Sequence, residues 1–174
     1  MISRKTGFWS LAVLVCLVPG CGYTRKTVLP KDIRTIYVET VQNKIPLKDM
    51  YAYAPGLEMM ITNAVVRRLN EDGNLKVVPK EKADAILQTD LTAFEQGGVR
   101  FSSLESVDEY RLFIVVHAKL VDSKANAVIW DEPNFSGDTE YFVSKVRSIA
   151  REEAAERAVN RLAVNLVDRI VEDW

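Results

Sequence analysis

From residue 33 onward, the hydrophobic and polar positions of this chain follow two different periods. Short stretches rich in β-branched and aromatic residues predict strands over 33–41, 75–78, 85–94, 110–121 and 128–130, and 135–143 adds a further candidate strand. The stretch 110–121 shows the clearest alternation, because its apolar residues share one face: Tyr110, Leu112, Ile114, Val116, Ala118 and Leu120. These strands predict a sheet with one apolar face.

Two other segments repeat their apolar residues at helical spacing. The first begins at Pro55, whose fixed φ suits the first turn of a helix, and ends at Gly73. The second covers about residues 148–172 and carries a wide apolar stripe. Residues 42–53 and 96–108 are predicted to be loops, and residues 122–126 a hairpin turn.

These elements predict an α+β fold. Two amphipathic helices and a sheet with one apolar face bury their stripes most economically by packing against each other. We therefore expect a two-layer sandwich of about four mostly antiparallel strands, with two helices packed on one face. Residues 33–174 are expected to form this single domain.

The N-terminal segment has the parts of a secretory signal. Arg4-Lys5 precedes an apolar run over residues 7–18, which is too short to span a bilayer. Val18-Pro19-Gly20-Cys21 follows and resembles the lipobox of bacterial lipoproteins. The resemblance implies that residues 1–20 are a signal peptide and that Cys21 carries acyl chains such as palmitate. A plain secretory signal with an unmodified Cys21 is the alternative.

The same resemblance implies how the mature protein is attached and sorted. Residues 21–32 would form a lipidated tether that holds the domain to a membrane through its N-terminal lipid. In Gram-negative lipoproteins, Asp after the lipidated Cys favours retention in the inner membrane. Gly22 in this position therefore indicates the outer membrane, on its periplasmic side.

Composition excludes several classes of protein. Without residues 1–20, the chain has 21 Lys and Arg against 24 Asp and Glu, which argues against a nucleic-acid-binding surface. The two cysteines are Cys16, within the signal, and Cys21, so the mature fold is expected to contain no disulfide.

The residues that usually carry catalysis are sparse. His117 is the only histidine, and we expect it on the less buried face of a strand. No Gly-rich phosphate loop, nucleophile elbow or calcium-loop spacing is present in the sequence. The sequence predicts neither an enzyme nor a metal site nor a bound cofactor.

Several short motifs together resemble one family. They are Cys21-Gly22-Tyr23, Leu29–Ile36 entering the first strand, Ala83–Leu87 opening an alternating strand, Glu109–Leu112 starting the longest strand, and Ile129-Trp130 after the hairpin. Their order and spacing resemble the lipopolysaccharide-assembly lipoprotein family (LptE-like). This resemblance implies a two-helix, four-stranded sandwich that binds lipopolysaccharide without catalysing any reaction. It also implies a partner, an LptD-type outer-membrane β-barrel that the protein plugs and helps to assemble.

A lipopolysaccharide contact requires cations for phosphate groups. The resemblance implies a basic residue in the connection between the third and fourth strands, where Arg100 lies beside Phe101. Arg111, Lys119 and Lys124 are further candidates, and the alternative is that all four are solvated surface charges.

The alternative function is that of a lipid-anchored component of another envelope machine, such as a secretion channel or an efflux system. A lipid-anchored hydrolase is disfavoured because no catalytic constellation is present.

Overall fold

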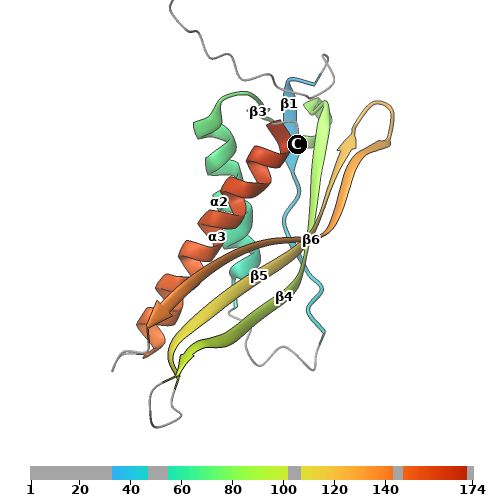
Figure 1. The fold of residues 1–174 in the computed structure, drawn as a ribbon. Helices are drawn as coiled ribbons and strands as arrows, with labels where there is room; N and C mark the ends of the chain where they lie inside the picture. The colour runs from blue at the N-terminus through green and yellow to red at the C-terminus, as the bar shows by residue number, and fades with distance from the viewer. Residues whose placement is uncertain (1–32, 47–54, 102–106, 143–146, 172–174) are drawn as a thin grey trace, which may run out of the picture.

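A computed structural model describes residues 33–46, 55–101, 107–142 and 147–171, with side chains from residue 151 in the last range. The elements follow in the order β1 (Thr35–Val38), β2 (Gln42–Asn43), α2 (Leu57–Asp72), β3 (Lys76–Val77), the 3₁₀ helix η3 (Lys80–Lys82), β4 (Ala85–Phe101), β5 (Val107–Asp122), β6 (Ala127–Phe142) and α3 (Arg147–Val171). Both helices lie on the same side of the sheet (Figure 1). The expected α+β class and its two helices on one face are confirmed.

The sheet has more strands than we expected, and it is mixed. Its six strands follow the order β3-β1-β4-β5-β6, with β2 also paired to β4. The long strands β4, β5 and β6 are antiparallel, but β1 runs parallel to β3 and β4, and β2 runs parallel to β4. The prediction of about four mostly antiparallel strands was therefore wrong in number and partly wrong in direction. β3 lies within the predicted strand 75–78, whereas β2 lies in the predicted loop 42–53, because a two-residue strand is too short to show alternation in the sequence.

The core lies between the helices and one face of the sheet. In β5 the side chains of Leu112, Ile114, Val116, Ala118 and Leu120 are fully buried, as their alternation predicts. From α3 they meet a stripe that includes Leu162, Leu166 and Val167, all fully buried. This burial removes the apolar stripes of both layers from water, which is the main stabilising term of the fold.

The glycine- and serine-containing region 96–108 is not simply a loop. β4 continues through Gly97 and Gly98 to Phe101, and β5 already begins at Val107. Gly98 suits the strand because a Cβ there would lie only about 3.1–3.2 Å from the side chains of Val107 and Phe101. Backbone pairing with β5 thus extends the hairpin into sequence that by composition predicts a loop.

The two segments predicted as strands at 128–130 and 135–143 form one strand, β6. The intervening Pro133 has no backbone N–H, which predicts a break in a regular ladder. The structure accommodates Pro133 at a register shift between the pairs Ala118–Glu132 and Val116–Phe135. An irregularity of this kind leaves a residue out of the ladder, so the strand continues past the proline.

Helix α2 begins and ends at glycines. Gly56 precedes it with φ 90°, and Gly73 ends it with φ 76° while donating its N–H to the Leu69 carbonyl at 3.1 Å. The predicted end at Gly73 is confirmed, and the predicted start at Pro55 lies two residues before the observed one. The second helix, Arg147–Val171, agrees within one residue with the expected 148–172.

Candidate functional site

The face of the sheet that points away from the helices, here called the outer face, carries the chemistry expected of a binding surface. The β5 side chains that alternate with the core, from Arg111 through His117 to Val121, lie on this face and are half-buried. All four predicted cationic residues lie on this face or at the ends of its strands. The predicted ligand contacts therefore all belong to the outer face or to its two ends.

Arg100 lies at the free end of the long hairpin, next to Phe101 at the end of β4. Backbone pairing aligns Arg100 with Glu109 of β5, and Glu109 with Phe142 of β6. The Arg100 Nη2 atom lies 3.3 Å from Glu109 Oε2, and its guanidinium carbon lies 5.7 Å from the centre of the Phe142 ring. Arg100 thus reaches across Glu109 and forms a cation–π contact with the next strand.

Three large apolar residues close to this arginine in the sheet are exposed to solvent: Phe142, whose ring it contacts, and its β4 neighbours Val99 and Phe101. The exposed fractions are 46% for Val99, 62% for Phe101 and 59% for Phe142. We call Val99, Arg100, Phe101, Glu109 and Phe142 the tip. Exposed apolar side chains close to one another mark a binding surface more often than isolated ones do, because their exposure costs free energy. One sign of the tip is visible in the sequence, where Arg100 lies beside Phe101, but no sequence signal indicates that Phe142 of β6 contributes.

Arg111 lies in the row of the outer face next to the tip. It forms an ion pair with Glu140, to which its Nε donates a hydrogen bond of 2.9 Å, and it lies 3.7 Å from Asp138. The hydrogen bond and the charge of Glu140 raise the pKa of Arg111 above its ordinary value. Arg111 is therefore held by two carboxylates of β6.

Lys119 lies eight residues beyond Arg111 in β5, a distance of roughly 27 Å at about 3.4 Å per residue. Its Nζ atom is 3.1 Å from Asp131 Oδ2, and His117 Nε2 is 2.5 Å from Asp131 Oδ1. The hydrogen bonds from His117 and Lys119 lower the pKa of Asp131. His117 lies on the less buried face of its strand, as expected, in a small charged cluster with Asp131 and Lys119.

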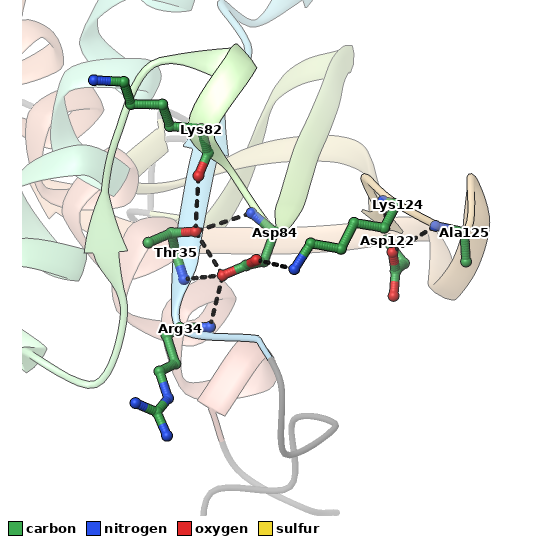
Figure 2. Close-up of polar contacts among 7 residues, drawn as sticks. All are labelled: Arg34, Thr35, Lys82, Asp84, Asp122, Lys124 and Ala125. Atoms are coloured by element: carbon green, nitrogen blue, oxygen red, sulfur yellow. Dashed lines mark hydrogen bonds and ion pairs between the residues drawn. The ribbon is translucent and has the colours of Figure 1, made fainter.

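Lys124 lies in the β5–β6 turn, at the other end of the sheet from the tip. Its Nζ atom donates a 2.7 Å hydrogen bond to Asp84, just before β4 (Figure 2). The other carboxylate oxygen of Asp84 accepts hydrogen bonds from the backbone N–H groups of Arg34 and Thr35 and from the Thr35 hydroxyl. Asp84 thus joins the starts of β1 and β4 to the hairpin turn, a structural role that the sequence did not reveal.

The four predicted cations do not form one cluster. Arg100 and Arg111 lie in neighbouring rows near the tip, whereas Lys119 and Lys124 lie toward the opposite end. Each has a carboxylate partner, but only Arg100 is also flanked by exposed large apolar side chains. Cys21 and Gly22, the predicted lipidation and sorting residues, lie outside the described residues.

A separate cleft of about 380 Å³ lies between β6 and α3, lined by Glu132, Phe135, Asn165, Asp168 and Arg169. Its charged groups already have partners: Arg169 lies 3.3 Å from Glu132, and Asp168 lies 3.4 Å from Arg68. Arg169 also covers the Trp130 ring at 5.4 Å. We assign these contacts to the packing of α3 on β6 and on α2.

The described residues also lack two features. No group of three or more His, Cys, Asp or Glu side chains that could hold a metal ion is found among them. None of the helices within the described ranges is both long and apolar enough to cross a membrane.

Comparison with known families identifies the chain. The model of the LptE family, described as lipopolysaccharide-assembly, matches residues 33–174. The protein belongs to the LptE family. This is the family that the motifs at 29–36, 83–87 and 109–112 resemble, and it is a family of non-enzymatic lipoproteins that assemble lipopolysaccharide. No curated protein matches the sequence.

Solved structures share the LptE fold seen here. A Xanthomonas campestris protein has a TM-score of 0.61 at 17% identity, covering 85% of this chain and 91% of its own. A hypothetical protein from Chlamydia trachomatis has a TM-score of 0.53 at 11% identity, covering 79% and 95%. An uncharacterized lipoprotein B from Nitrosomonas europaea has a TM-score of 0.50 at 18% identity, covering 79% and 84%. At these identities the similarity shows the fold alone.

Proposed function

We propose that this LptE-family protein is an outer-membrane lipoprotein that plugs an LptD-type β-barrel, helps to assemble it, and assists the delivery of lipopolysaccharide to the outer leaflet. Membership of the family supports the assembly role. The lipobox-like residues 18–21 support attachment through acyl chains on Cys21, and Gly22 supports sorting to the outer membrane. Two or more acyl chains would anchor the protein stably without a transmembrane helix.

The observation that carries the ligand proposal is the composition of the tip. Lipopolysaccharide presents phosphate groups next to acyl chains, so its binding site needs a cation beside apolar surface. Arg100 supplies a planar guanidinium with five N–H donors, and its side chain is 63% exposed. Phe142 supplies exposed apolar surface in contact with it, and the exposed residues Val99 and Phe101 adjoin it in β4. The tip thus matches both parts of an anionic amphiphile.

Arg111, Lys119 and Lys124 are proposed as secondary contacts only. Arg111 is close enough to the tip to contact a second phosphate group once its pairing with Glu140 is exchanged. Lys119 and Lys124 lie toward the far end of the sheet, and Lys124 stabilises Asp84. A single ligand headgroup cannot bridge both ends of strands this long.

The partner is tested by isolating the full-length protein from its native envelope in a mild detergent and identifying the bound proteins by mass spectrometry. We expect a stoichiometric outer-membrane β-barrel of the LptD type, and an intact mass of this chain that includes acyl groups on Cys21. Recovery of the protein without a barrel, or mainly as a self-associated ring, would contradict the plug role. That result would favour a component of another envelope machine.

Replacing Arg100 by alanine should weaken lipopolysaccharide binding about five- to tenfold, because one charge-assisted contact to phosphate is lost. The measurement is the dissociation constant of purified lipopolysaccharide for the full-length protein in detergent, with circular dichroism to verify the fold. Arg157→Ala is the matched control, since it also removes a surface arginine, 51% exposed, but on α3. Equal affinities of the Arg100 variant and the wild type would exclude Arg100 as a ligand contact.

A further inference from the structure

Glu109 is unusual among the charged residues that the structure describes, because it is the buried one. Glu109 is only 8% exposed to solvent, although it lies on the outer face at the tip. The neighbouring side chains that cover it come from the two adjacent strands: Arg100 from β4 lies across it and reaches the Phe142 ring on β6. Glu109 is therefore enclosed beneath the cation that we propose as the ligand contact.

This arrangement gives Arg100 an internal anionic partner before any ligand arrives. Burying a carboxylate is costly unless a cation compensates it, so Arg100 and Glu109 stabilise each other in the free protein. A phosphate group that binds Arg100 meets the negative charge of Glu109 close by, and it must compete with that carboxylate for the guanidinium donors. Part of the attraction of Arg100 for the ligand is thus offset by Glu109.

We propose that Glu109 is a built-in competitor that weakens the binding of phosphate-bearing amphiphiles at the tip and thereby makes their release possible. The inference rests on the proposed ligand contact of Arg100 and adds to it the regulation of that site. The ligand chemistry is a phosphate group attached to acyl chains, which lipid A and the phospholipid phosphatidic acid share. A protein that passes its ligand onward needs such a limit on affinity, since tight contacts slow dissociation.

The test is Glu109→Gln, which keeps the shape of the side chain and an oxygen acceptor for Arg100 but removes the charge. We expect this variant of the full-length protein in detergent to bind lipopolysaccharide about tenfold more tightly than the wild type, mainly through a slower dissociation rate. Glu153→Gln is the control, because it neutralises an exposed carboxylate that also pairs with an arginine, Arg157, but on α3, and it should change the affinity less than about twofold.

A double variant with Arg100→Ala shows whether the gain acts through the arginine. We expect Glu109→Gln to have no effect on affinity when Arg100 is already replaced, because the effects of two residues that act through one contact are not additive. A gain of the same size without Arg100 would overturn the inference, since it would reflect only the net charge of the surface.

Failure of this inference can be distinguished from failure of the ligand contact. Unchanged or weaker binding by Glu109→Gln, with Arg100→Ala still weakening it, overturns the competitor role but leaves the Arg100 contact in place. If Arg100→Ala has no effect either, the ligand contact itself is wrong. The same titrations with dihexanoyl phosphatidic acid separate the two sources: a larger gain with lipopolysaccharide assigns lipid A, and a gain with phosphatidic acid alone overturns the link to lipopolysaccharide.

Discussion

Replacing Gly137 by alanine should destabilise the fold by about 3 kcal/mol, at the upper end of the usual cost of overpacking. Gly137 is a buried residue of β6, directly under α3. A Cβ atom there would lie only 2.6 Å from the Ala158 carbonyl oxygen and 2.6 Å from the Leu162 backbone nitrogen. Backbone atoms of a helix cannot rotate away as a side chain does, so α3 would have to shift as a unit. The cost is therefore large for a single methyl group.

The measurement is the free energy of unfolding of the two proteins in denaturant, together with the melting temperature, which should fall by roughly 10 °C. Gly97→Ala is the matched control, because a Cβ at Gly97 meets no atom within 4 Å. We expect this control to change stability by less than about 0.5 kcal/mol. A Gly137→Ala protein as stable as the control would show that α3 does not pack on β6 as closely as described.

Replacing Asp84 by alanine should cost about 2–3 kcal/mol of stability, because it removes the acceptor of several hydrogen bonds at once. The backbone N–H of Thr35, the Thr35 hydroxyl and the Lys124 ammonium lie 3.1, 2.7 and 2.7 Å from the carboxylate. Lys124→Ala, which removes only an exposed ion pair, should cost less than about 0.5 kcal/mol. Equilibrium unfolding of the three proteins measures both differences, and equal costs for the two variants would assign the effect to the ion pair alone.

The contribution of Asp84 should also depend on pH. Hydrogen bonds from Lys124, from Thr35 and from the Arg34 backbone lower the pKa of Asp84 well below its ordinary value. Because the pKa is lower in the folded state, the carboxylate stabilises the fold fully above its unfolded-state pKa of about 3.9 and progressively less as pH falls below it. The stability difference between the wild type and Asp84→Ala should therefore be smaller at low pH than at neutral pH. A difference that stays constant with pH would contradict the charged role of Asp84.

The long elements were predictable because their patterns are long. α3 repeats apolar residues over seven turns, and β5 alternates over five buried apolar positions, so their types followed directly from the sequence. Gly73 predicted the end of α2 because a left-handed residue suits glycine there. β3 lies within the predicted strand 75–78, but β2 was not predictable, because two residues carry no period, and the parallel pairing of both depends on distant partners.

The candidate site was predictable only in part. Arg100 was identified through the family resemblance, and the structure adds that Phe101 and Val99 beside it are exposed. Phe142 lies more than forty positions away in sequence, so only the pairing of three strands brings it to Arg100. The burial of Glu109 has the same origin, since an acidic residue at the start of a strand gives no sign of what will cover it.

The sequence by itself determined the α+β class, the two helices, the apolar face of the long strands and the family. These properties depend on local periodicity and on motifs that neighbouring residues form. Only the tertiary structure decided the parallel strands, the close contact of α3 with Gly137, the Asp84 network and the composition of the tip. Each of these joins residues from different elements, and their contacts follow from strand register and helix packing, which no local pattern encodes.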